Sequence, residues 1–255
     1  MILAVDIGNT NIVIGLMEGT ETVDTYRITT RSNHTSDEYG LMILQFLQLS
    51  NSSPDDVQDA IISSVVPKVM HSFISSMIKF LGIDPMIIGP GIKTGMNIIM
   101  DNPKTVGSDM IVDAVAAIRE YPGPIIIIDM GTATTMSVVD KSGNYIGGII
   151  YPGLRVSLDS LSSKTAQLPS ISLDIPKRVI GKNTIDCMRS GIMYGNAGMI
   201  DGIIDHMEEE IGEPATIIAT GGLSRFVVPL CRHKIIYDDA LLLKGLMILY
   251  EKNKA

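Results

Sequence analysis

The fold is decided by a stretch near the start of the chain, AVDIGNTNIVIGL at residues 4–16. One apolar run ends at Asp6, a turn of glycine and small polar residues follows, and a second apolar run begins after it. Apolar runs bounded by turn-prone residues predict strands, here at residues 2–7, 11–17 and 21–28. The Asp6 carboxylate is therefore expected at the end of a strand, directly before a tight turn.

The same arrangement occurs again about half a chain later. The stretch PIIIIDMGTATTMSVVDKSGNYIGGIIYPG, residues 124–153, is again strand, turn, strand, turn, strand, and its Asp129-Met130-Gly131 matches Asp6-Ile7-Gly8. Helical and strand patterns alternate after each triple. The sequence predicts an α/β fold of two similar domains, residues 1–117 and 118–255, each a mixed sheet with flanking helices in βββαβαβα order, around a nucleotide cleft.

Capping residues predict where the helices begin. Thr35, with Glu38 three residues on, forms a capping-box signature, and Pro67 suits the first turn of the next helix. Ser108 and Asn183 are candidate N-caps of two later helices. The long helix after Asn183 contains four glycines, which indicate either close helix packing or a break: Gly191, Gly195, Gly198 and Gly202.

Composition limits the partners. The chain has 255 residues, 45% of them hydrophobic, and a net charge of −8, which argues against nucleic acid and acidic membranes. The longest apolar runs are too short to span a bilayer. Cys187 and Cys231 have no metal spacing or disulfide pattern, as expected of thiols in a reducing compartment. We expect a cytoplasmic protein.

The two aspartate–glycine turns suit a site for phosphate and metal. Glycine lets backbone N–H groups approach an anion, and Asp6 can hold Mg²⁺ directly or through water. Each turn alone is equally typical of an ordinary hairpin, but a pair at equivalent points of a repeat favours a grip on a triphosphate. The stretch ATGGLS, residues 219–224, offers Gly221 and Gly222 as a surface for adenosine. No Walker-type phosphate loop is present.

A second informative stretch, DNPKTVGSDMIVDAV at residues 101–115, leads into a helix with Asp109 in its first turn. A carboxylate there is stabilised by the helix dipole, so Asp109 is either a capping charge or a general base. Asp113, one turn on, could raise the pKa of its neighbour, although acidic pairs at this spacing are common on solvated faces.

Over nearly the whole chain, these motifs resemble type III pantothenate kinases. The resemblance includes DIGNTN (6–11), SSVVP (63–67), GPGIKTG (89–95), DNPKTVGSD (101–109), DMGTATT (129–135), GGIIYPG (147–153), GKNT (181–184), SGIMYG (190–195) and ATGGL (219–223). It implies the fold of the acetate and sugar kinase, Hsp70 and actin superfamily. It also implies a homodimer that phosphorylates pantothenate with ATP, Mg²⁺ and K⁺ or NH₄⁺, in the first step of coenzyme A synthesis.

The resemblance also implies roles for individual residues. Asp109 would accept the proton, and Asp129 would hold the monovalent cation. ATP contacts would come from Asp6, Ile7, Gly8, Asn9, Thr10, Asn11, Ile12, Val13 and Thr132. The pantothenate site would include Met100, Gly107, Ser108, Asp109, Met110 and Thr184.

Two residues depart from the family pattern. The usual G-A-D-R is here Gly107-Ser108-Asp109-Met110, and Met100 stands where an aromatic residue is frequent. Methionine supplies neither the charge nor the donors with which arginine binds a carboxylate. Two alternatives therefore stay open: an ATP-binding relative with a decayed acceptor site that acts as a regulatory or transcription accessory factor, and a kinase for another small hydroxy compound.

Overall fold

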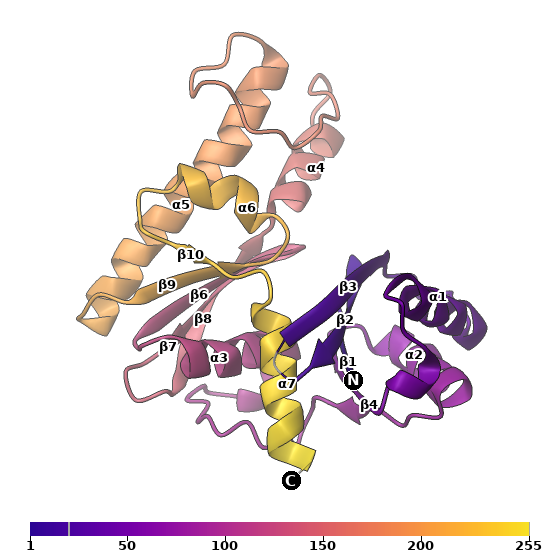
Figure 1. Cartoon of the computed structure of the whole chain (residues 1–255). Coiled ribbons are helices and arrows are strands. Elements are labelled where there is room, and N and C mark those ends of the chain that lie inside the picture. Colours follow the sequence, from indigo (N-terminus) through magenta and orange to yellow (C-terminus); the bar gives the residue numbers. More distant parts are fainter. Residues whose placement is uncertain (20, 255) are drawn as a thin grey trace. The chain divides into compact units, whose positions relative to one another are not determined.

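The computed structural model describes residues 1–19 and 21–254, which form two compact units (Figure 1). The first unit comprises Met1–Gly95, Asn102–Ala116 and Ala240–Ala255. The second comprises Met96–Asp101 and Ala117–Asp239.

Apart from Ala117, which is grouped with the second unit, this grouping differs from a single division between residues 117 and 118 in two places. The C-terminal helix α7 (Leu241–Lys254) belongs to the first unit, because it packs on strands β1 and β4 of that unit. Residues 96–101 belong to the second unit, because the backbone of Asn97 and Ile99 hydrogen-bonds to Tyr145. Neither long-range contact leaves a local sequence signal.

The first unit is built on a five-stranded mixed sheet in the order β3-β2-β1-β4-β5. The antiparallel triple is β1 (Ile2–Ile7), β2 (Asn11–Glu18) and β3 (Glu21–Thr29). Strand β4 (Asp59–Ser64) runs parallel to β1, and the short β5 (Met86–Ile87) runs parallel to β4.

The sheet of the second unit repeats this order. Strands β6 (Ile125–Met130), β7 (Ala133–Val139) and β8 (Tyr145–Pro152) form the antiparallel triple. Strands β9 (Thr216–Thr220) and β10 (Ile236–Tyr237) continue it in parallel, giving the order β10-β9-β6-β7-β8. The predicted repeat is confirmed strand by strand.

The first strands of the two triples also share a burial pattern. Asp6 is the half-buried penultimate residue of β1, between buried Val5 and Ile7. Asp129 has the same place in β6, between buried Ile128 and Met130. Because strand side chains alternate between the two faces, each aspartate is fixed in direction by its apolar neighbours.

The helices of the first unit begin largely where capping residues predict. In α1 (Ser36–Leu49), Thr35 and Glu38 form the expected capping box. Helix α2 (Pro67–Leu81) starts at its proline and ends at Gly82 in the left-handed conformation. Helix α3 (Ser108–Glu120) starts in the first unit and ends in the second, and the short 3₁₀ turns η1 (Pro54–Asp56) and η2 (Pro103–Thr105) precede β4 and α3.

Helices α4 (Leu154–Lys164) and α5 (Thr184–Ile211) lie between β8 and β9 in the chain, followed by the short α6 (Ser224–Val227) and η3 (Val228–Leu230). Asn183 caps α5 as predicted, accepting a hydrogen bond from the backbone N–H of Asp186 at 2.9 Å. Of the two expectations for the α5 glycines, a break is wrong, and close packing against another helix is not seen within the described part of the chain. The helix is continuous, and a Cβ added at any of the four glycines would have no neighbour within 4 Å.

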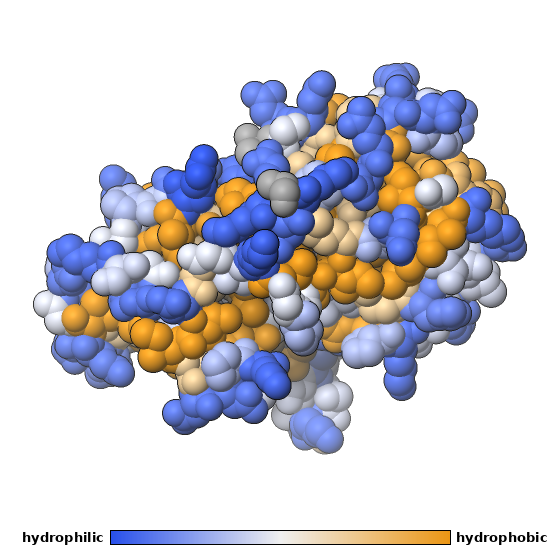
Figure 2. All heavy atoms as spheres, turned by 90° about the horizontal axis from the view of Figure 1, so that it is seen from below, coloured by the Kyte–Doolittle hydropathy of each residue, from blue (hydrophilic) through white to orange (hydrophobic). Residues whose placement is uncertain are grey.

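Each sheet has its own apolar core. In the first unit Tyr39, Phe46 and Phe73 pack on the strands, and in the second Met193, Ile200 and Leu154 do so. The surface in Figure 2 shows apolar areas divided by hydrophilic side chains. None of the helices in the described ranges combines the length and apolarity that a bilayer crossing demands.

Candidate active site

The turn after Asp6 is held from two sides. Inside it, the backbone N–H of Gly8 donates to the carbonyl of Asn11 at 3.0 Å. From β3, the backbone N–H of Thr30 donates to the carbonyl of Thr10 at 2.9 Å, and the Thr30 hydroxyl donates to the carbonyl of Gly8 at 2.6 Å. All three hydrogen bonds are accepted by backbone carbonyls of the loop or the strand after it, so they order the loop without using its side chains.

The residues of this loop divide by exposure. Asn9 and Thr10 are exposed, whereas Gly8, Asn11 and Val13 are half-buried. Ile7 and Ile12 are fully buried in the core, so their side chains hold the hairpin in place and are not available to a ligand. Of the predicted stretch from Asp6 to Val13, the exposed tip therefore offers the polar groups that an anion needs.

The second hairpin has a similar turn that is one residue shorter. Here the backbone N–H of Gly131 donates to the carbonyl of Ala133 at 3.0 Å. A Cβ placed on Gly131 would lie 3.8 Å from Asp129 Oδ2, and one on Gly8 would lie 3.9 Å from Asp6 Oδ2. In both hairpins, the aspartate carboxylate is directed toward the glycine of its own turn.

Gly221 lies against Asp129. It follows β9, whose Thr220 is the register partner of Asp129, and has φ of 85°. A Cβ at this position would lie 2.4 Å from Asp129 Oδ1 and 2.8 Å from the backbone of Met130, so only glycine fits. The second unit therefore brings Asp129 and the predicted glycine pair, Gly221 and Gly222, together. Thr132 is exposed at the turn.

Asp109 is in the first turn of α3, and burial raises the pKa of its carboxyl above the ordinary range of an aspartate. The backbone N–H of Met110 donates to Asp109 Oδ1 at 2.9 Å, which opposes that rise. A Cβ on Gly107 would lie 2.4 Å from the same oxygen. The glycine before the helix is thus what allows the carboxylate to fold back there.

Ser108 does not cap α3, because it is already the first helical residue. Its hydroxyl instead accepts a hydrogen bond of 3.1 Å from the hydroxyl of Ser63 and donates one of 3.1 Å to the carbonyl of Ser64. Ser63 is fully buried at the end of β4 and is the register partner of Asp6. The first unit therefore joins the strand end beside Asp6 to the helix start that carries Asp109.

Sequence reasoning did not identify Ser63 as a functional residue. Its place in the SSVVP stretch at a strand end was visible, but its link to Ser108 depends on contacts 45 residues apart in the chain.

The remaining predicted acceptor residues lie in the second unit. Met100 is 38% exposed, and its sulfur would lie 3.6 Å from a Cβ on Gly147. Thr184, the exposed first residue of α5, lines a hollow of about 440 Å³ together with Gln167, Pro169, Asn183 and Ile185. Met110, by contrast, is half-buried in the first unit.

The carboxylates fit single-ligand cation sites better than a closed metal centre. Among residues 1–19 and 21–254, no group of three or more histidine, cysteine, aspartate or glutamate side chains could hold a metal ion. Mg²⁺ in phosphate-transfer sites usually takes one or two protein carboxylates, with waters and phosphate oxygens completing its shell. Asp6, beneath a glycine turn, fits that pattern.

The sequence matches a known family over most of its length. A family model described as type III pantothenate kinase matches residues 2–206. A type III pantothenate kinase of Bifidobacterium animalis subsp. lactis is 63% identical over 254 residues, covering 99% of this chain and 100% of that protein. One from Listeria monocytogenes serovar 1/2a is 44% identical over 254 residues, covering 100% and 98%.

Solved structures agree on the fold at low identity. A Baf family transcriptional activator from Campylobacter jejuni, described as conserved and putative, aligns with a TM-score of 0.60 at 20% identity, over 99% of this chain and 98% of that one. A putative 2-dehydro-3-deoxygalactonokinase from Sinorhizobium meliloti gives 0.60 at 10% identity, over 99% and 97%. The predicted architecture of two similar domains, each a mixed sheet with flanking helices, is confirmed.

Proposed function

Because the chain belongs to the type III pantothenate kinase family, and so phosphorylates pantothenate with ATP and a divalent metal in coenzyme A biosynthesis, we propose a role for each part of its site. The observation that carries the proposal is the link from Asp6 through Ser63 and Ser108 to Asp109 within the first unit. It relates the strand end suited to a metal-bound triphosphate to the carboxylate suited to activate the acceptor hydroxyl.

The loop from Asp6 to Asn11 binds the phosphates. Asp6 would hold Mg²⁺ there, and the ion would offset the phosphate charge. Backbone N–H groups and the exposed Asn9 and Thr10 side chains supply donors, and the bonds from Thr30 preorganise the loop before ligand arrives.

Asp109 serves as the general base. The acceptor hydroxyl oxygen attacks the γ-phosphorus, the bond from that phosphorus to the β–γ bridging oxygen breaks, and ADP leaves with that oxygen. The hydroxyl proton passes to the Asp109 carboxylate. Burial raises the pKa of Asp109 and so brings its proton affinity closer to that of a useful base, and the backbone hydrogen bond from Met110 opposes that rise.

Asp129 holds the monovalent cation, K⁺ or NH₄⁺. Support comes from its half-buried carboxylate, which lies between Gly131 and Gly221 with little room for any other side chain. Gly221 and Gly222 provide a flat backbone surface for the nucleotide, and Thr132 supplies a further hydroxyl. The cation would offset charge on the phosphoryl group.

The acceptor site draws on Gly107 to Met110, with Met100 and Thr184. With Met110 in place of the family's arginine, pantothenate loses one bidentate partner, so we expect a raised KM more than a lowered kcat. Reaction in the cytoplasm follows from the demand for ATP and K⁺.

We also place a homodimer interface on the open face of α5. Ile192, Ala197 and Ile200 bury one side of this helix, whereas Gly191, Gly195 and Gly198 lie exposed on another with open space around them. Small residues allow a second helix to approach closely. Gly195→Glu should convert a dimer into a monomer by light scattering, while Glu210→Gln on the exposed end of α5 should not.

The experiment that tests the cation and acceptor roles is steady-state ADP release with pantothenate in K⁺, NH₄⁺ or Na⁺. We expect turnover that needs K⁺ or NH₄⁺ and that falls steeply in Asp129→Asn, with Asp159→Asn on exposed α4 as the matched control. Equal rates in Na⁺ and K⁺, or an unaffected Asp129→Asn variant, would refute the assigned cation site.

A further inference from the structure

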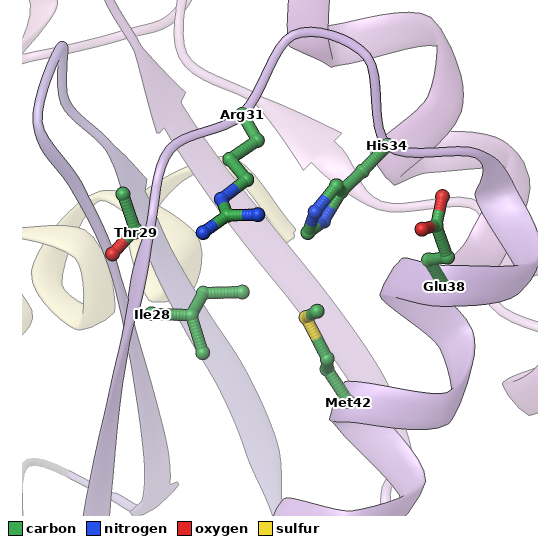
Figure 3. Close-up of a pocket in the computed structure, with 6 residues that line it drawn as sticks. All are labelled: Ile28, Thr29, Arg31, His34, Glu38 and Met42. Carbon is green, nitrogen blue, oxygen red and sulfur yellow. The ribbon is translucent and has the colours of Figure 1, made fainter.

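A hollow of about 340 Å³ lies between the end of β3 and the first two turns of α1, apart from the residues assigned to catalysis. Its lining residues are Ile28, Thr29, Arg31, His34, Glu38 and Met42. In Figure 3, Arg31 and His34 face each other across it from the β3–α1 loop, with Ile28 and Met42 on its apolar side. All six belong to the first unit.

From this arrangement we propose a binding site for a small organic anion: a carboxylate or phosphate group against Arg31 and His34, on a short aliphatic chain against Ile28 and Met42. The volume is at the lower end for ligand pockets, so the ligand is small.

The basic side chains of the hollow act on Glu38 through charge, where they help to lower its pKa, but they have no hydrogen-bonded partner among the described residues. Across residues 1–19 and 21–254, the Arg31 guanidinium makes no ion pair or hydrogen bond, and the buried Nδ1 of His34 has no hydrogen-bond partner. A guanidinium binds a carboxylate or phosphate through two parallel hydrogen bonds, which is the recognition that an exposed arginine on a hollow offers.

The walls are preformed by Tyr39, which is fully buried. Its hydroxyl donates to the Arg31 carbonyl at 2.7 Å, and its ring lies 5.3 Å from the His34 ring. One core residue thus fixes the backbone of Arg31 and the ring of His34. A preformed site loses less entropy when the ligand binds.

Glu38 is the one acidic group on the lining. Its Oε2 accepts from the Thr35 backbone N–H at 2.7 Å and from the Thr35 hydroxyl at 3.0 Å, and these bonds lower its pKa. Glu38 therefore stays ionised as the capping-box carboxylate, and its charge weakens the attraction for an anion. Removing that charge should strengthen binding.

A ligand in the hollow should affect the phosphate loop, because residues next to the hollow are bonded to that loop. Thr29 on the lining is the register partner of Asn11, and Thr30 bonds to Gly8 and Thr10. An anion that restrains this segment should change the affinity for MgATP by a factor of a few, and MgATP should change the affinity for the anion equally. This coupling rests on the proposed role of the loop, whereas binding to the hollow does not.

The test is a titration of the full chain, labelled with ¹³C in its methionine and isoleucine methyl groups, followed by NMR. The probes are butyrate and butyl phosphate, with inorganic phosphate lacking the chain and 1-butanol lacking the charge. We expect saturable shifts at Met42 and Ile28 with the first two probes, at millimolar Kd, and weaker binding of the other two. The stronger of the two anions identifies the headgroup.

Three variants decide the assignment. Arg31→Gln should weaken anion binding roughly tenfold, as expected for a charge-assisted pair, while Arg119→Gln, an equal charge loss on exposed α3, should leave it unchanged. Glu38→Gln, which can still cap, should tighten it. The proposal is overturned by the absence of saturable shifts up to about 50 mM, by equal affinity in Arg31→Gln, or by weaker binding in Glu38→Gln. If anions bind but the affinity for MgATP does not change, the binding site is supported and the proposed coupling to the phosphate loop is refuted.

Discussion

The hydroxyl of Ser63 donates a hydrogen bond of 3.1 Å to the hydroxyl of Ser108 and so joins the end of β4 to the helix turn that carries Asp109. The start of α3 is held to the end of β4 by this bond and by the bond from the Ser108 hydroxyl to the Ser64 carbonyl.

A double-mutant cycle tests that link. Ser108→Ala and Ser63→Ala should each lower kcat/KM several-fold, and Ser108→Ala should lower it more, because it also removes the bond to the Ser64 carbonyl. The double variant should lose no more than Ser108→Ala alone, because Ser63→Ala removes only the bond that the two share. The expected coupling in unfolding free energy is about 0.5–1.5 kcal/mol. Additive losses would show that the two hydroxyls act separately. Ser142→Ala, at an exposed turn position where the backbone N–H makes the hydrogen bond to Asp140, controls for loss of a serine outside this link.

Because the pKa of Asp109 is raised in the native state, ionisation of this carboxyl lowers the free energy of unfolding. The native state binds the proton more tightly than the unfolded chain, so this loss is complete above the native pKa and vanishes as pH falls below the ordinary 3.8. Asp109→Asn should therefore have a higher Tm than the parent at pH 7, with the gap closing in acid. Calorimetry across pH checks this, with Asp84→Asn as an exposed control. A lower Tm for Asp109→Asn at pH 7 would contradict it.

Two glycine substitutions should act in opposite directions. Gly202→Ala, in α5 but outside the proposed dimer face, should stabilise the chain by about 0.5–1 kcal/mol, because alanine loses less backbone entropy in a helix. Gly221→Ala should destabilise it, since its φ of 85° and the 2.4 Å approach to Asp129 leave no space. Urea unfolding measures both. An unchanged free energy of unfolding in Gly221→Ala would contradict the close packing of Gly221 on Asp129.

The departure at position 110 has a kinetic consequence. Met110→Arg should lower KM for pantothenate by about tenfold or more with a smaller change in kcat, because a guanidinium restores a partner for the carboxylate. Lys68→Arg, on an exposed part of α2, is the control for an added guanidinium. An unchanged KM would mean that Met110 does not weaken acceptor binding.

Local patterns predicted most of the fold. The turn after Asp6, its repeat after Asp129, the Thr35 capping box and the Asn183 cap all depend on neighbours in sequence, and all were confirmed. The grouping of α7 with the first unit and the open glycine face of α5 depend on which surfaces meet in space. The helical periodicity of the sequence alone does not predict these two features.

For the candidate site, the sequence supplied the residues, and their roles stay predictions. Motif order pointed to Asp6, Asp109 and Asp129, since each stands at an element end next to glycine. The hydrogen bond from Ser63 to Ser108 and the approach of Gly221 to Asp129 join distant segments, and no spacing rule predicts such contacts. The hollow at Arg31 was also missed, because its residues read as an ordinary loop and helix start.

The measurement that tests the account most directly is pantothenate-dependent ADP release by Asp109→Asn, alongside calorimetric binding of MgATP to the same variant. If Asp109 accepts the hydroxyl proton, kcat should fall by about 10²–10⁴ while the Kd for MgATP stays at the parent value. Turnover at the parent rate, with MgATP binding intact, would contradict the assignment of the base.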